Sequence, residues 1–131
     1  MKVLALDYGR ARTGVAVSDP TGTIARPLCV VERAGSGDGL ARLAALIGEH
    51  EVDCVVVGLP LTLRGGRGEQ VRETESFIEA LNDVTKVPVV TFDERFTTAL
   101  AEQAPADTPE DARAAAHLLS SYLAWASGAP A

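Results

Sequence analysis

The chain has 131 residues, of which 47% are hydrophobic, and it carries a formal net charge of −6. This length and apolar content predict one compact domain, residues 1–131, with a core large enough to fold unaided and a disordered tail over 127–131. The acidic balance excludes the broad basic face of a nonspecific nucleic-acid coat, but it allows carboxylates clustered around metal ions. Neither an apolar run of membrane-spanning length nor a basic-then-apolar leader is present, so we expect a cytoplasmic protein without membrane contact.

The N-terminal part of the chain predicts three consecutive strands. Residues 2–7, 14–19 and 24–32 are rich in β-forming residues and are separated by short turns of Gly, Pro or Thr, which is typical of an antiparallel meander. Residues 34–39 break this pattern, and apolar residues then recur at helical spacing over 40–50. A first helix is therefore expected after the meander.

Strands and helices alternate in the rest of the chain. Residues 52–58 are almost all apolar, as expected for a central parallel strand that helices cover on both faces. The further elements predicted are a glycine-rich loop (59–68), a helix (71–81), a strand (87–92), a short helix (96–103) and a terminal helix (110–125). This order predicts an α/β fold with a mixed five-stranded sheet, three antiparallel strands and then two parallel ones, and helices on both faces. Ribonuclease H-like folds have this order.

Asp7 is the first candidate functional residue, because its carboxylate ends the buried run of residues 3–6 where the chain turns back. Removing a lone carboxylate from water costs several kcal/mol unless a cation or hydrogen-bond donors compensate it. A divalent metal ion is one such partner, and Gly9 and Gly14 allow a tight turn and a thin returning strand. The alternative is a hairpin in which Asp7 only caps the turn.

Four sequence blocks occur in a fixed order along the chain. They are Leu6-Asp7-Tyr8-Gly9 with Arg12-Thr13-Gly14-Val15-Ala16, Val57-Gly58-Leu59-Pro60-Leu61, Asp93-Glu94-Arg95-Phe96-Thr97-Thr98, and Asp111 leading to Tyr122-Leu123. Together they resemble the RuvX, or YqgF, family of candidate Holliday junction resolvases within the ribonuclease H-like group. The resemblance implies a hydrolase that cuts structured nucleic acid, either four-way DNA junctions or the precursor of 16S ribosomal RNA at its 5′ end. Nothing in the residues chooses between the two substrates.

The same resemblance implies three converging carboxylates, Asp7, Glu94 and Asp111, that bind two Mg²⁺ or Mn²⁺ ions, with Asp93 as a further ligand. Ions roughly 4 Å apart would hold the scissile phosphate, activate water and stabilise the departing oxygen. Each acid also has a purely structural alternative. The acids at 93–94 would then be a solvated strand end that pairs with Arg95, and Asp111 would be a dipole-favoured acid in a first helical turn.

Cationic and hydroxyl side chains near the predicted strand ends are the candidates for contacts with nucleic acid. They are Arg10, Arg12, Arg64, Arg67, Arg95, Thr97 and Thr98. Tyr122 and Trp125 lie on or near the apolar stripe of the last predicted helix. We expect them to be core or docking residues rather than platforms for stacked bases.

The chain departs from the family pattern before Asp111, where a longer, often lysine-rich segment is replaced by residues 99–110 without a cation. An element that grips the substrate is therefore expected to be missing. Cleaving a junction symmetrically would also need a homodimer, which no residue pattern predicts. Two other classes stay open: a nucleotide binder related to sugar kinases and actin-like ATPases, because of residues 7–9, and a noncatalytic RNA- or ribosome-associated protein.

Overall fold

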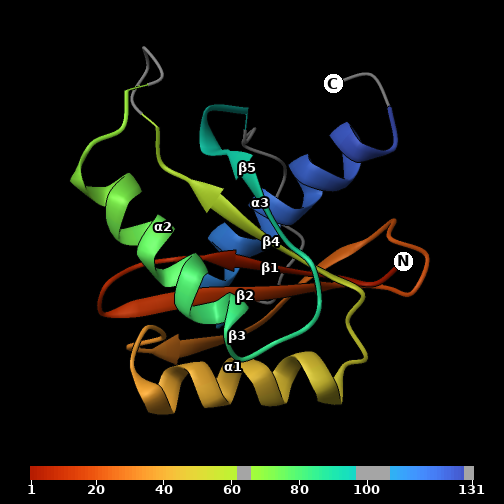
Figure 1. Ribbon diagram of the computed structural model, residues 1–131. Helices are drawn as coiled ribbons and strands as arrows, with labels where there is room; N and C mark the ends of the chain where they lie inside the picture. Colours follow the sequence, from red (N-terminus) through yellow and green to blue (C-terminus); the bar gives the residue numbers. More distant parts are fainter. Residues whose placement is uncertain (62–65, 97–106, 129–131) are drawn as a thin grey trace.

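The computed structural model describes residues 1–61, 66–96 and 107–128, and a five-stranded sheet lies at its centre (Figure 1). The strands are β1 (Val3–Asp7), β2 (Arg12–Ser18), β3 (Ala25–Glu32), β4 (Cys54–Leu59) and β5 (Val89–Asp93), in the spatial order β3-β2-β1-β4-β5. β2 is antiparallel to both β1 and β3, whereas β4 is parallel to both β1 and β5. The predicted mixed sheet is therefore confirmed.

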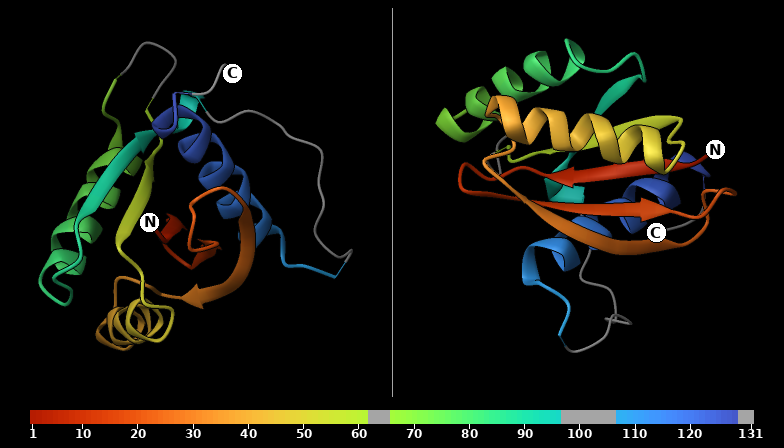
Figure 2. Two further views of the ribbon diagram at one scale, coloured as in Figure 1. Left: turned by 90° about the vertical axis from the view of Figure 1, so that its right-hand side faces the viewer. Right: turned by 90° about the horizontal axis from the view of Figure 1, so that it is seen from below.

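Helices cover both faces of this sheet. They are α1 (Gly37–Glu49), α2 (Glu69–Asn82), the short 3₁₀ helix η1 (Glu94–Phe96) and α3 (Glu110–Ala126). α1 and α2 lie on one face and α3 lies on the other, as the two turned views show (Figure 2). No helix within the described ranges has both the length and the apolar character needed to cross a bilayer.

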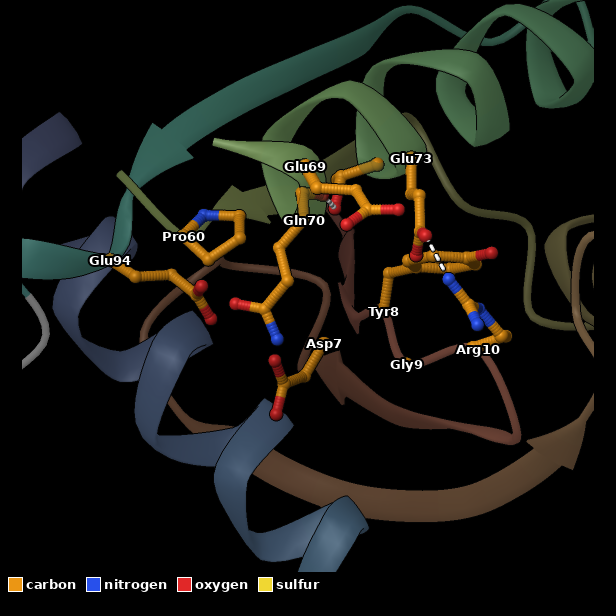
Figure 3. Close-up of a pocket in the computed structure, with 10 residues that line it drawn as sticks. Asp7, Tyr8, Gly9, Arg10, Pro60, Glu69, Gln70, Glu73 and Glu94 are labelled. Carbon is orange, nitrogen blue, oxygen red and sulfur yellow. Dashed lines mark hydrogen bonds and ion pairs between the residues drawn. The ribbon is translucent and has the colours of Figure 1, made fainter. Parts of the chain in front are cut away.

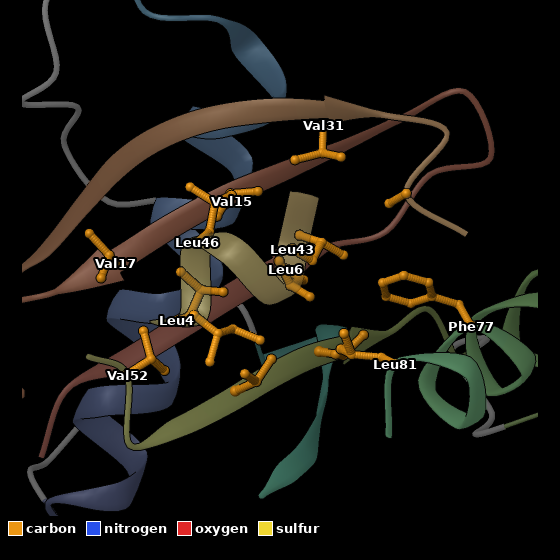
Figure 4. Packing of buried hydrophobic residues seen from close by; sticks show 14 residues of the cluster. Leu4, Leu6, Val15, Val17, Val31, Leu43, Leu46, Val52, Phe77 and Leu81 are labelled. Atoms are coloured by element: carbon orange, nitrogen blue, oxygen red, sulfur yellow. The ribbon is translucent and has the colours of Figure 1, made fainter. Parts of the chain in front are cut away.

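Alternate residues of the central strands enter two separate cores. Leu4 and Leu6 belong to the core on the side of α1 and α2 (Figure 4), whereas Val3 and Ala5 belong to the core beneath α3. A strand that is buried on both faces must be apolar at nearly every position. This explains why the predicted strand 52–58 is a continuous apolar run instead of an alternating one.

The first helix begins earlier than the sequence pattern predicts. Gly37 starts α1 inside segment 34–39, because the side chain of Ser36 accepts a hydrogen bond of 3.1 Å from the backbone N–H of Gly39 and so caps the helix. Of the short helix predicted over 96–103, only Phe96 lies within the described residues, where it ends η1. Of the predicted tail, residues 129–131 also lie outside them.

Candidate active site

The carboxyl ends of β1, β4 and β5 meet at one edge of the sheet, because these three strands run parallel to one another. Asp7 is the last residue of β1, and Glu94 follows the last residue of β5. Both side chains line a cavity of about 480 Å³ (Figure 3). The fold thus joins two acids from opposite ends of the sequence into one pair.

Gly58 of β4 makes room for this pair. A Cβ atom at this position would lie 2.8 Å from Cγ of Glu94, closer than real Cβ contacts come. Gly58 pairs with Phe92 on β5, so it lies directly across from the strand that delivers Glu94. A side chain at Gly58 would push Glu94 away from Asp7.

Gly14 of β2 has a corresponding role for Asp111. A Cβ atom at Gly14 would lie 1.8 Å from the backbone oxygen of Asp111, so only glycine lets α3 begin against this strand. Gly14 is also the register partner of Asp7. The start of α3 is therefore held beside the end of β1, and the carboxylate of Asp111 is close enough to act electrostatically on Asp7.

The electrostatics of the pair follow from its partial burial. Burial raises the pKa of Asp7, the hydrogen bond from Glu94 opposes this shift, and the charge of Asp111 adds to it. Burial, together with the charge of Asp7, raises the pKa of Glu94 to about 7. Burial thus favours the protonated form of Glu94, which can donate a hydrogen bond to the carboxylate of Asp7.

These carboxylates fit a divalent cation in part. Carboxylate oxygens are the ligands that Mg²⁺ and Mn²⁺ prefer, and the proton that Asp7 and Glu94 share offsets charge that a cation would otherwise neutralise. Within residues 1–61, 66–96 and 107–128, however, no group of three His, Cys, Asp or Glu side chains is arranged to hold a metal ion. Asp111, the third predicted ligand, is paired with Arg12, whose Nε lies 3.1 Å from its carboxylate oxygen. A cation at this place would therefore find two carboxylates, those of Asp7 and Glu94, and Asp111 would have to leave Arg12 to offer a third.

Asp93 is turned toward Arg95. Its carboxylate accepts a 2.9 Å hydrogen bond from the backbone N–H of Arg95 and bonds of 3.0 and 2.8 Å from the guanidinium Nε. The hydrogen bonds from Arg95 lower the pKa of Asp93. Asp93 therefore matches the structural alternative of a strand end that pairs with Arg95.

Each predicted phosphate-contact arginine within the described residues pairs with an acid. The ion pairs are Arg10 with Glu73, Arg12 with Asp111, Arg67 with Glu75, and Arg95 with Asp93. The first three pairs are largely exposed and contribute only about 0–1 kcal/mol each, so a phosphate group can compete for these arginines. In the fourth pair only 32% of the Arg95 side chain and 15% of the Asp93 side chain are exposed. The remaining candidates, Arg64, Thr97 and Thr98, lie outside the described residues.

One wall of the cavity escaped the sequence-based prediction. Glu69, Gln70, Glu73 and Thr74 of α2 line it together with Tyr8, and Gln70 extends toward Asp7 (Figure 3). The sequence pattern predicts this helix over 71–81 and assigns no role to the polar residues of its first two turns. Their spacing, i to i+4 directly after the glycine-rich loop, was the available signal, because such residues share one helix face.

A mixed sheet with helices on both faces, and with acids at the carboxyl ends of β1 and β5, defines a protein of the ribonuclease H-like class. Residues 1–125 match the RuvX family, described as Holliday junction resolvase. The chain belongs to the RuvX family, which confirms the resemblance inferred from the four sequence blocks.

Curated relatives support this membership. A protein of Roseiflexus sp. (strain RS-1) is 40% identical over 116 residues, which cover 86% of this chain and 82% of the relative. A protein of Syntrophomonas wolfei is 36% identical over 132 residues, which cover 94% of each chain. Both relatives are described as candidate pre-16S rRNA nucleases.

Among solved structures, Thermus thermophilus RuvC in complex with a Holliday junction substrate has a TM-score of 0.68 and 18% sequence identity. The match covers 98% of this chain and 96% of that chain. At this identity the likeness shows the fold, and it confirms the predicted ribonuclease H-like architecture.

Proposed function

We propose that the protein is a metal-dependent nuclease that hydrolyses phosphodiester bonds of structured nucleic acid in the cytoplasm. The observation that carries the proposal is that Asp7 and Glu94, at the ends of two strands of the sheet, line one cavity. Two carboxylates that share a proton in a partly buried place are a poor arrangement for stability alone, because their mutual repulsion and burial both disfavour ionisation. Such a pair is suited to a site that binds a cation.

In this proposal, Asp7 and Glu94 bind Mg²⁺ or Mn²⁺, and Asp111 completes the ligand set. Bound divalent ions would supply an activated water and would stabilise the leaving oxygen of the phosphate. Asp7 and Glu94 give up their shared proton on binding, so cation affinity depends on pH. When Asp111 turns to the cation, the guanidinium of Arg12 is released beside the site, where it can contact a phosphate oxygen.

The relatives and the family description suggest two substrates, the precursor of 16S ribosomal RNA and four-way DNA junctions. Trimming the 5′ end of an RNA strand needs one active site. Cutting a junction symmetrically needs two active sites, and hence a homodimer. We propose nucleic acid as the partner in both cases, and the oligomeric state during cleavage distinguishes the two activities.

Cleavage of matched labelled substrates tests the proposal. A four-way DNA junction and a structured RNA are incubated with Mn²⁺, Mg²⁺ or EDTA, using the wild type, Asp7→Asn and Glu94→Gln. Glu49→Gln is the matched control, because Glu49 is an exposed acid at the end of α1, outside the site. We expect cleavage that requires metal, Asp7 and Glu94 and that is unchanged in the control.

Cleavage in EDTA, or retained activity of Asp7→Asn, would contradict the proposal. Absence of cleavage together with tight binding of the RNA would instead support a noncatalytic RNA-binding role. The pairing of Asp111 with Arg12 favours that role as the second candidate, because it leaves the described metal ligands incomplete.

A further inference from the structure

Two large aromatic side chains lie on the surface and are not among the buried residues of the two cores. Trp125 near the end of α3 is 67% exposed, and Phe96 at the end of η1 is 62% exposed. Of the two expected roles, core or docking residue, the core role is therefore wrong for Trp125, whereas Tyr122 is half-buried and packs against the core beneath α3. Exposing two such rings forgoes a large hydrophobic gain, so a binding partner is the simplest reason for them.

Both exposed rings are anchored on Phe92, which is buried beneath α3. The ring centroid of Phe92 lies 5.9 Å from that of Trp125, at an interplanar angle of 56°, and 6.3 Å from that of Phe96, at 62°. Tyr122 adjoins both Phe92 and Trp125, with centroids 5.8 and 6.0 Å away. We name these four residues the aromatic cluster. Because these ring contacts are tilted or edge-on rather than face to face, Phe96 and Trp125 stay largely exposed, although the guanidinium carbon of Arg95 lies 5.9 Å from the centroid of the Phe96 ring.

The aromatic cluster continues directly from the acid pair. Phe92 is on β5, Glu94 begins η1 and Phe96 ends it, so one short segment carries two aromatic rings and the acid between them. Two residues span at most about 7 Å of backbone, which places Phe96 next to Glu94. A strand whose phosphate lies at Asp7 and Glu94 therefore reaches the cluster with its adjoining nucleotides.

The exposed area argues against a second protein chain as the occupant. Phe96 and Trp125 together offer on the order of 300 Å² of aromatic surface. A stable protein interface needs about 800 Å² from each partner. The charged side chains of Glu94 and Arg95 also interrupt the apolar surface between Phe92 and Phe96. A nucleobase, in contrast, needs only one ring face to stack on.

We propose that Trp125 and Phe96 form a stacking subsite for unpaired bases that flank the bond cut at Asp7 and Glu94. This inference rests on the proposed function for the nature of the ligand, and it narrows the substrate class. Bases within a continuous duplex are already stacked on their neighbours, whereas bases of single strands and loops have free faces. The preferred substrates therefore have unpaired nucleotides beside the cleavage position.

Trp125 is the only tryptophan of the chain, so its fluorescence reports directly on the subsite. The full-length Asp7→Asn variant, which binds without cutting, is titrated with a short single-stranded RNA, a single-stranded DNA, a blunt duplex and inorganic polyphosphate. Binding is followed in parallel by the anisotropy of labelled strands. We expect both single strands to quench the fluorescence, and the duplex and polyphosphate to leave it unchanged.

Substitutions then assign the effect. Trp125→Leu and Phe96→Ala should each weaken binding of the single strand roughly 5- to 100-fold, and Trp125→Phe should retain most of the affinity, because a ring face remains. The matched control is Ile24→Ala, which removes a side chain that is 60% exposed beyond β2. Affinity for the duplex should not change in any of these variants.

Unchanged fluorescence at saturating single strand, or equal affinity of Trp125→Leu and wild type, would overturn the inference, and so would a complete lack of single-strand binding. Fluorescence that depends on protein concentration without nucleic acid would identify a second copy as the occupant and overturn it too.

Wild-type cleavage with metal tests the proposed function separately. Cleavage without quenching refutes only the stacking subsite, and quenching without cleavage refutes only the nuclease.

Discussion

The two halves of the candidate site are in opposite electrostatic states. Asp7 and Glu94 are half-buried, and burial raises the pKa of both carboxyl groups, with no cation paired to either among the described residues. Asp111 is more open and is already neutralised by Arg12, with 42% and 65% of the two side chains exposed. The three acids were expected to bind metal together, but they differ in whether a positive charge already lies beside them. A bound cation would compensate the charge of the first pair, but at Asp111 it would have to replace Arg12.

The same contrast applies to the glycines that position the two halves. At Gly14 an added Cβ would meet the backbone of Asp111, which a helix cannot withdraw without moving as a whole. At Gly58 it would meet the end of the Glu94 side chain, which can rotate away. One glycine therefore governs the packing of α3, and the other governs the position of a single carboxylate.

The largest expected effect is that of Gly14→Ala. We expect this substitution to lower the free energy of unfolding by about 3 kcal/mol, because α3 must shift away from β2. Gly58→Ala should lower stability by much less but should still reduce cleavage, since Glu94 is displaced from Asp7. Urea denaturation measures the first effect, and cleavage assays on folded protein measure the second.

Gly48→Ala is the control, because nothing lies within 4 Å of its added Cβ. Equal unfolding energies for the substitutions at Gly14 and Gly48 would contradict this account.

Next in size is the dependence of cation binding on pH. Because Glu94 with a pKa of about 7 must lose its proton, Mn²⁺ affinity should fall about tenfold for each pH unit below 7. Titration calorimetry in two buffers of different ionisation enthalpy measures both the affinity and the released proton. Glu94→Gln should bind Mn²⁺ weakly and release no proton. A flat profile from pH 5 to 8 in the wild type would show that Glu94 is not a ligand.

The same pKa shift predicts a stability effect without metal. The folded pKa of Glu94 is about 7 and its ordinary value is 4.5, so the folded state binds more protons between these values. The contribution of Glu94 to stability is therefore most favourable below pH 4.5 and is lost as the pH rises through 7. Melting temperatures in EDTA should fall with pH more steeply for the wild type than for Glu94→Gln. Parallel melting curves would argue against a shared proton.

The smallest effect on stability is expected for Arg12→Ala. An exposed ion pair contributes less than about 1 kcal/mol, so unfolding should change little. Cation affinity should increase, since Asp111 no longer has a competing partner, whereas affinity for nucleic acid should decrease. Calorimetry and anisotropy measure these two changes. Cation affinity that decreases in Arg12→Ala would mean that Arg12 positions Asp111 for binding instead of holding it back.

Much of the architecture follows from local pattern. The apolar run at 52–58 and the helically spaced apolar residues around it predict the order of strands and helices. This is possible because elements buried on one face and elements buried on two faces differ in the periodicity of their apolar residues. Asp7 is recognisable for a related reason, because a charged residue at the end of a buried strand must lie at the edge of the sheet, whereas Glu94 became a candidate through the resemblance to the RuvX family. The sequence by itself thus determined the fold class, the order of the strands along the chain and the candidate acids Asp7 and Glu94.

Only the tertiary structure decided which partner each of these groups has. The shared proton of Asp7 and Glu94, the pairing of Arg12 with Asp111 and the exposure of Trp125 all depend on how distant segments pack. A charge is compensated, and a ring is buried, by whatever lies within a few ångströms in space, and sequence spacing does not specify that neighbour. The sequence therefore determines which chemical groups are present at the site, and the packing of the helices on the sheet determines their state.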